Sequence, residues 1–223
     1  MEVRIRHEGV LEVHAPNSFS LVMIEGFLKR KAKWIGEKLA MFRERQSLLS
    51  ERSSSIDKKC FYLGESRAVK LAARSARWGR IIFDSDGWVV EVPAHISASD
   101  HQSYAHEFLE KWFKSHALVI LKDRVKSYAH LMGDEPGIIR IRSPKGLWGS
   151  CHPIKRTLHF NWKIIMAPIE VIDYLVVHEL SHLRVADHSQ KFWARVERYC
   201  PGYKLRQEWL KRNGYQLRLP FAS

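Results

Sequence analysis

The first quarter of the chain changes from an alternating pattern of apolar and polar residues to a helical one. Val3–Val13 alternates, which predicts a hairpin with Glu8-Gly9 at its turn. Phe19–Arg45 places apolar residues three and four apart, which predicts an amphipathic helix. The polar, serine-rich run at 48–59 is predicted to be a linker.

The middle of the chain predicts several strands followed by one long helix. Short strands are expected within Cys60–Val92, with a hairpin turn at Asp84–Gly87. Ser97 or Ser99 is predicted to cap the N-terminus of the helix, because a hydroxyl oxygen accepts hydrogen bonds from the free amides of the first turn. Gly133 is predicted to end it.

A second group of strands precedes a short apolar helix. Strands are predicted at 138–142, 147–151 and 157–165. Pro168 is placed like the first residue of the next helix, where its missing N–H costs nothing. That helix is apolar nearly all round, so we expect it to be buried.

Composition and charge narrow the class of protein. Apolar residues make up 45% of the 223 residues, which excludes an intrinsically disordered protein. The 37 basic residues outnumber the 24 acidic ones and give a net charge of +13. This charge favours weak binding to polyanions such as nucleic acid, with lysines clustered between Lys29 and Lys38, although solubility explains it equally well.

Cysteine content and apolar segments bear on the compartment. Three scattered cysteines exclude a disulfide framework and a four-cysteine zinc site. The N-terminus lacks the apolar core of a signal peptide, and no stretch approaches the roughly 18 uninterrupted apolar residues of a membrane span. We therefore expect a soluble protein of the reducing cytoplasm with no membrane partner.

The apolar helix carries an HExxH motif, formed by His178, Glu179 and His182. Side chains four residues apart share one face of a helix, so the two imidazoles can converge on one metal ion. Glu179 lies about 100° around the helix, where its carboxylate can reach a water molecule without being a ligand. Such polar groups on a buried helix are costly unless a metal or strong hydrogen bonds satisfy them. The motif predicts a catalytic zinc site.

A catalytic zinc ion normally has three protein ligands. We favour His188 as the third, because the short turn at 185–187 can fold it back over the helix. Its spacing matches the metzincin pattern, but Val185 replaces the metzincin glycine and no later methionine can form a Met-turn. Glu197 and Glu208 are the alternative third ligands.

The C-terminal third of the chain resembles the YgjP-like metallopeptidases, which are related to the SprT-like and WLM zinc peptidases. The matching segments are LWGSC (147–151), LHFNWKIIMAP (158–168), VIDYLVVHELSHL (171–183), DHSQKFW (187–193) and PGYKLRQEWL (201–210). The resemblance implies a zincin-like α+β fold with small antiparallel sheets packed with the zinc-binding helix. It also implies that His178, His182 and His188 bind Zn²⁺ and that Glu179 is the catalytic base. Leu147 departs from the family, whose members often have arginine there.

We accordingly expect a hairpin, basic helix and linker at 1–58, a β-rich segment at 59–96 and a zincin-like metallopeptidase domain at 97–223. One continuous domain over 1–223 is the alternative. The segment 147–151 is predicted to pack beside the zinc site. Further candidates for contact with the oxyanion or the substrate are Tyr203, Arg206 and His152.

The predicted substrate is an extended peptide or an unfolded protein. The strand at 157–165 is expected to present a sheet edge beside the metal, where a peptide can add as a further strand. A hydrolase of nucleoside triphosphates remains an alternative, although the chain has no glycine-rich phosphate loop. A nucleic-acid-associated protein with a structural zinc is a third hypothesis; Glu179 argues against it, since a structural site needs no base.

Overall fold

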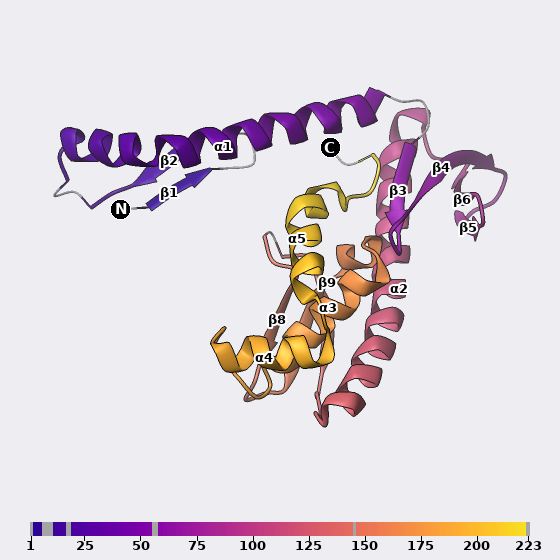
Figure 1. The fold of residues 1–223 in the computed structure, drawn as a ribbon. Helices are drawn as coiled ribbons and strands as arrows, with labels where there is room; N and C mark the ends of the chain where they lie inside the picture. The colour runs from indigo at the N-terminus through magenta and orange to yellow at the C-terminus, as the bar shows by residue number, and fades with distance from the viewer. Residues whose placement is uncertain (1, 6–10, 17–18, 55–57, 145, 222–223) are drawn as a thin grey trace. The chain divides into compact units, whose positions relative to one another are not determined.

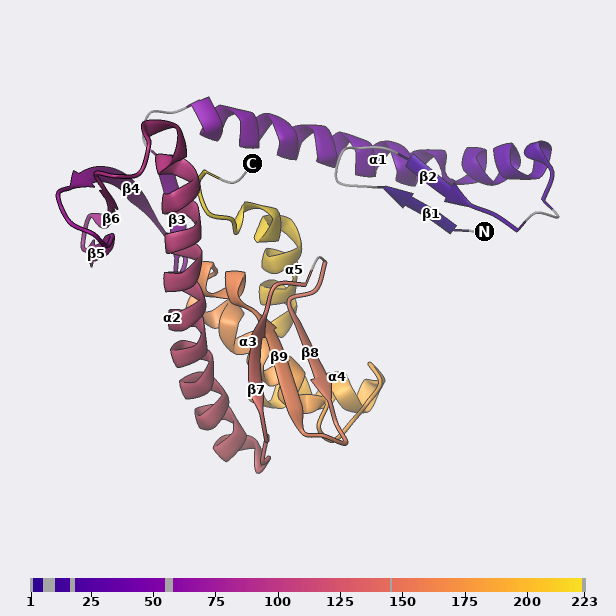
Figure 2. The ribbon, with the colours of Figure 1, turned by 180° about the vertical axis from the view of Figure 1, so that it is seen from behind.

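The computed structural model describes residues 2–5, 11–16, 19–54, 58–144 and 146–221. It divides into two compact units, Met1–Ile56 and Asp57–Ser223. Figure 1 labels the α-helices and the strands of both units except β7, which is labelled in Figure 2. Among the described helices, none is long and apolar enough to cross a membrane.

The first unit consists of a two-stranded sheet and a long helix. Strands β1 (Glu2–Ile5) and β2 (Leu11–His14) pair antiparallel, which confirms the predicted hairpin, whose turn lies outside the described residues. Helix α1 spans Leu21–Ser54, so the first part of the predicted linker is helical instead. The helix continues because no glycine or proline occurs in its last 18 residues, which are rich in leucine, glutamate and arginine.

The second unit begins with a four-stranded sheet. Its strands are β3 (Lys58–Tyr62), β4 (Glu65–Arg74), β5 (Arg80–Asp84) and β6 (Gly87–Pro93), in the order β3-β4-β6-β5. The predicted turn between β5 and β6 is confirmed, since Asp84 pairs with Gly87 across a two-residue loop. Gly87 has a φ of 130°, a conformation that favours glycine.

Helix α2 (His101–Met132) is the spine of this unit. A short 3₁₀ turn, η1 (Ala98–Asp100), precedes it, and neither Ser97 nor Asp100 caps a helix with its side chain. The predicted serine cap was wrong, because the Ser97 hydroxyl donates to the Asp100 carboxylate and contacts Ser99. Gly133 ends the helix in the left-handed conformation, as predicted.

A three-stranded sheet follows, made of β7 (Ile139–Arg142), β8 (Gly149–His152) and β9 (Thr157–Asn161). Its order is β7-β9-β8, with β9 parallel to β7 and antiparallel to β8. The predicted strand at 157–165 therefore ends early and is central, so it was wrong as the sheet edge. Asn161 turns the chain into the 3₁₀ helix η2 (Trp162–Met166), because its side-chain oxygen accepts from the Lys163 amide.

Three helices complete the unit: α3 (Ile169–Ser181), α4 (Gln190–Tyr199) and α5 (Tyr203–Asn213), followed by the 3₁₀ turn η3 (Gly214–Gln216). Pro168 directly precedes α3. Figure 2 shows the three strands side by side with α2 alongside and α3 behind them. The predicted α+β class is confirmed, although each of the two larger sheets contains one parallel pair.

Candidate metal centre

The HExxH motif lies at the C-terminal end of α3, which is apolar apart from Glu170, Asp173 and the motif itself. Val171, Ile172, Val176, Val177 and Leu180 are all buried. His178 and Glu179 lie in the last turn, and His182 directly follows the helix. Burial against α2 and η2 therefore fixes the helix that carries these three side chains.

The structure brings His178, His182 and His188 together. The ring nitrogens that could bind a metal all lie within 4.8 Å of one another. Nε2 of His188 is 3.2 Å from Nε2 of His178. Nδ1 of His182 is 3.1 Å from the Val185 carbonyl oxygen, so this nitrogen carries the proton and the lone pair stays on Nε2.

The chemistry of this cluster fits a metal ion. Burial and the two neighbouring imidazoles lower the pKa of His178 to about 3, which keeps it neutral at physiological pH. Burial also lowers the pKa of His182. Three imidazole nitrogens this close together form a group that suits zinc and leaves one coordination position open.

Neither glutamate that was an alternative third ligand joins the cluster. Glu197 accepts a hydrogen bond from the Gly202 amide at 3.2 Å. Glu208 pairs with Arg212 at 2.7 Å on the exposed surface of α5. Within the described residues, the group with metal-binding potential contains His188 and neither glutamate.

Two aromatic residues of α4 hold the imidazoles in place. The ring of Phe192 is fully buried. The distance from its centroid to the ring centroid is 4.9 Å for His178, 4.4 Å for His182 and 4.8 Å for His188. Trp193 stacks on His188, with ring centroids 5.6 Å apart. The beginning of α4 therefore supports all three histidines.

A buried carboxylate that the motif analysis missed fixes the segment carrying His188. Asp134 Oδ1 accepts from Arg184 Nε at 2.8 Å, and Oδ2 accepts from Arg195 Nη2 at 2.6 Å. The Asp134 side chain is 0% exposed. Because one arginine precedes His188 and the other follows it, Asp134 ties both flanks of the segment to the end of α2. No local sequence pattern indicates contacts that span 50 and 61 residues.

Glu179 is 3% exposed and lies against the edge strand β8. Among the described residues, its Oε2 atom has no hydrogen-bond partner, and burial raises the pKa of the carboxyl group to about 8. A Cβ atom at Gly149 would lie only 2.8 Å from Cδ of Glu179, so the position must be glycine for this packing. The predicted location of the segment 147–151 beside the histidine motif is thereby confirmed.

The three further candidates lie at different distances from the histidines. Tyr203 is buried and stacks on Trp193, with ring centroids 5.0 Å apart, so one ring separates it from His188. Arg206 donates to the Pro201 carbonyl at 2.6 Å and supports the turn before α5. His152 is exposed at the far end of β8 from Gly149. Contact of these residues with a substrate stays a prediction.

Two of the solved structures that are similar to part of this chain are metallopeptidase zymogens. The structure of the metallopeptidase zymogen abylysin of Pyrococcus abyssi is 24% identical, with a TM-score of 0.39 over 44% of this chain and 97% of that chain. The structure of the metallopeptidase zymogen jannalysin of Methanocaldococcus jannaschii is also 24% identical, with a TM-score of 0.36 over 41% of this chain and 91% of that chain. No curated protein sequence matches.

The family comparison covers nearly the whole chain. A model of the YgjP-like family, described as a metallopeptidase domain, matches residues 1–213 of the 223. This match includes both units and all three histidines of the cluster. The chain therefore belongs to the YgjP-like family of metallopeptidases.

Proposed function

We propose that this protein is a zinc-dependent peptidase that hydrolyses peptide bonds with Glu179 as general base. One observation carries the proposal: three histidines, of which burial keeps His178 neutral, converge next to the buried Glu179, whose Oε2 atom has no hydrogen-bond partner in the described part of the chain. A structural zinc site needs no such carboxylate and usually fills its fourth position with a protein ligand.

His178, His182 and His188 would hold the zinc ion. When bound, zinc supplies Lewis acidity, which polarises a carbonyl oxygen and makes a water molecule more acidic. Phe192 packs against the three imidazoles, and Asp134 holds Arg184 and Arg195 on either side of His188. Both keep the histidines in position in the absence of the ion. Such preorganisation limits the reorganisation that binding would otherwise require.

Glu179 moves the proton. Its carboxylate accepts a proton from the attacking water and then donates it to the amine that leaves, which balances the reaction. Burial against Gly149 makes the carboxylate more basic than an exposed one, because desolvation disfavours its charged form. The apolar surroundings of α3 exclude competing water from this side of the site.

The edge strand β8 is the proposed substrate-binding strand. In the described part of the chain, β8 pairs only with β9, so its other side is open for an added strand. Main-chain hydrogen bonds to such an edge hold a peptide in extended form. Because Gly149 of β8 packs on Glu179, a peptide along this edge passes the proposed base.

A substrate panel tests this proposal. The zinc-loaded protein is incubated with denatured casein, a mixed peptide library and nucleoside triphosphates, with Glu179→Gln as the blank. We expect cleavage of casein and peptides that is lost in the blank. Release of phosphate that depends on Glu179, with no peptide cleaved, would replace the peptidase with a phosphoanhydride hydrolase.

A further inference from the structure

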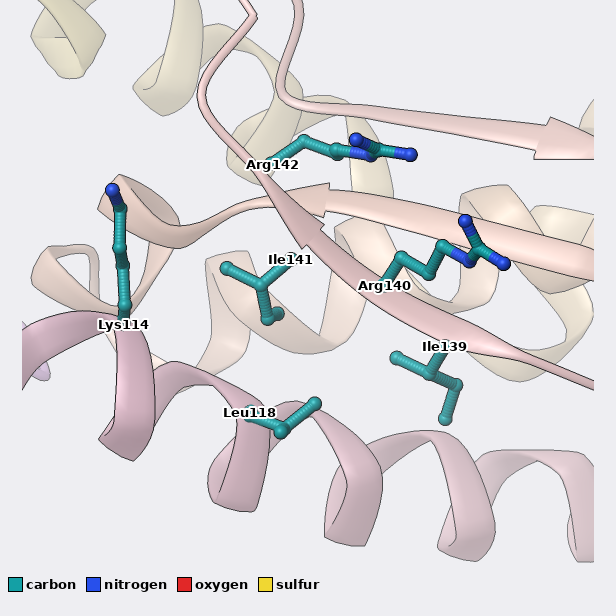
Figure 3. A pocket seen from close by; sticks show the side chains of 6 residues that line it. All are labelled: Lys114, Leu118, Ile139, Arg140, Ile141 and Arg142. Atoms are coloured by element: carbon teal, nitrogen blue, oxygen red, sulfur yellow. The ribbon is translucent and has the colours of Figure 1, made fainter. Parts of the chain in front are cut away.

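The two faces of the three-stranded sheet differ in chemistry. Ile139 and Ile141 point toward α2, whereas Arg140 and Arg142 point away from it (Figure 3). On the central strand, Leu158 and Phe160 are fully buried, whereas His159 is half-buried. The register pairs Arg140 with His159 and His159 with Ser150, so these polar residues share the outer face.

This outer face is basic. Within the described residues, neither Arg140 nor Arg142 takes part in an ion pair. Desolvation and the positive charges of Arg142 and Arg140 lower the pKa of His159, so it stays neutral beside them. Arg140 and Arg142 are therefore exposed to solvent, and within the described residues their guanidinium groups are available to donate hydrogen bonds.

The outer face forms a hollow at the beginning of β8, with a volume of about 470 Å³. Its lining includes Arg142, Ser143, Pro144, Leu147, Ser150 and His159. Asn161 holds one wall, because its side-chain amide donates to the carbonyls of Pro144 and Leu147. A second hollow, of about 400 Å³, lies between α2 and β7 and also includes Arg142 (Figure 3).

The hollow and Glu179 adjoin the same edge strand. A Cβ atom at Gly149 would point at Glu179, and the next side chain, Ser150, points to the other face and lines the hollow, to which Gly149 itself also contributes. An extended peptide beside β8 would place alternate side chains on the two faces. Side chains near Glu179 would thus alternate with side chains directed into the basic hollow.

We propose that this hollow selects peptides with an acidic side chain at positions that alternate with those facing Glu179. The inference rests on the proposed peptidase function and names its substrate class. A glutamate carboxylate would accept charge-assisted hydrogen bonds from the Arg142 guanidinium, which matches a carboxylate in shape and charge. Ser150 and His159 provide further polar groups on the way to it.

An acidic peptide fits this face better than a nucleic acid. Binding of single strands depends on exposed aromatic rings on which bases stack. The phenyl ring that borders the hollow, Phe160, is 0% exposed, and the imidazole of His159 beside it is half-buried, so the rings of the lining offer little surface for stacking. The hollow also directly adjoins an edge that can bind a main chain, which a peptide uses and a nucleic acid does not.

The test is a walk of single glutamates along one cleavable peptide, with glutamine at the same position as the neutral reference. The zinc-loaded full chain is assayed for kcat/KM. We expect glutamate to be preferred about tenfold or more, at alternate positions only. In Arg142→Gln the preference falls below about threefold, because kcat/KM falls more for the glutamate peptides than for the glutamine peptides. Arg142→Lys restores part of the preference, because the charge remains but the paired donors are lost.

The matched control is Arg77→Gln, which removes the same charge from an exposed position between β4 and β5 and keeps the full preference. Absence of a glutamate preference, or its survival in Arg142→Gln, would overturn the inference while leaving the peptidase intact. Failure to cleave even the glutamine peptides would instead refute the proposed function and the inference with it. Arg142-dependent binding of a single-stranded oligonucleotide, tighter than that of the acidic peptide, would assign the face to nucleic acid.

Discussion

The two faces of the sheet β7-β9-β8 differ in burial and in charge. The inner face is apolar, packs on α2 and α3, and holds Glu179 against Gly149. The outer face carries Arg140, Arg142 and His159 and takes no part in the core. Burial fixes the geometry of the inner side and raises the pKa of Glu179 there, whereas exposure leaves the outer side free to contact a partner. Substitutions on the inner face should therefore change kcat, and substitutions on the outer face should change the preference among peptide substrates.

The largest effect is expected from removal of a metal ligand. His188→Ala should lose zinc and nearly all hydrolysis, because two imidazoles hold the ion much more weakly than three. Zinc content after dialysis and peptide turnover measure both. Glu208→Ala is the control and should retain zinc, since Glu208 pairs with Arg212. Zinc loss in the Glu208 variant together with full occupancy in His188→Ala would reverse the ligand assignment.

The inner face can be perturbed without removing any catalytic group. Gly149→Ala places a Cβ atom 2.8 Å from Cδ of Glu179, so the carboxylate must shift. We expect kcat to fall about tenfold or more with zinc content unchanged, because a base displaced by a fraction of an ångström transfers protons poorly. Ser150→Ala, one residue along the strand and on the outer face, should leave kcat on a neutral peptide unaltered. Equal effects of the two variants would contradict the division between the faces.

The ion pairs of Asp134 with Arg184 and Arg195 should affect metal affinity only by fixing the position of the segment that carries His188. Asp134→Asn removes the charge that holds Arg184 and Arg195, so we expect zinc affinity to fall about tenfold and the free energy of unfolding to fall by about 1–3 kcal/mol. Competition with a chelator and thermal unfolding measure these effects. Asp173→Asn breaks the pair with Arg124, in which both hydrogen bonds are 2.6 Å. This control should lower stability but keep zinc affinity. Equal zinc loss in both variants would show that the Asp134 ion pairs contribute only to the overall stability of the protein.

The smallest effect is expected from the basic helix α1, which belongs to the first unit and not to the sheet β7-β9-β8. Lys29, Lys31 and Lys33 are exposed, and the net charge is +13. We expect weak binding to DNA, RNA or polyphosphate, without sequence preference and lost as salt rises. Anisotropy titration at low salt measures it, and replacement of the three lysines by glutamine should weaken it. No binding to any polyanion would leave solubility as the role of this charge.

Local patterns predicted what depends on local geometry. The HExxH spacing placed His178 and His182 on one side of a helix, because the helical repeat alone decides this. Gly133 and the turn at Asp84–Gly87 followed from the backbone conformations that glycine permits. The closeness of His188 to the other histidines also followed from the sequence, since only a short turn separates it from α3.

Features that depend on distant contacts were not predictable in this way. The strand at 157–165 was expected at the sheet edge, but strand order is decided by pairing with β7, whose residues lie well before it in the chain. The same holds for Asp134, whose partners are 50 and 61 residues away. The basic outer face likewise arises only when Arg140, His159 and Ser150 from three strands come into register.

The most direct test of the peptidase function is one paired measurement on Glu179→Gln: its zinc content and its turnover of a casein-derived peptide. Glutamine has nearly the shape of glutamate but cannot accept the proton from water. We expect about one zinc ion per chain, as in the parent protein, and a rate reduced roughly 10²–10⁴-fold. A variant that keeps its zinc and more than about a tenth of the parent rate would show that Glu179 is not the base.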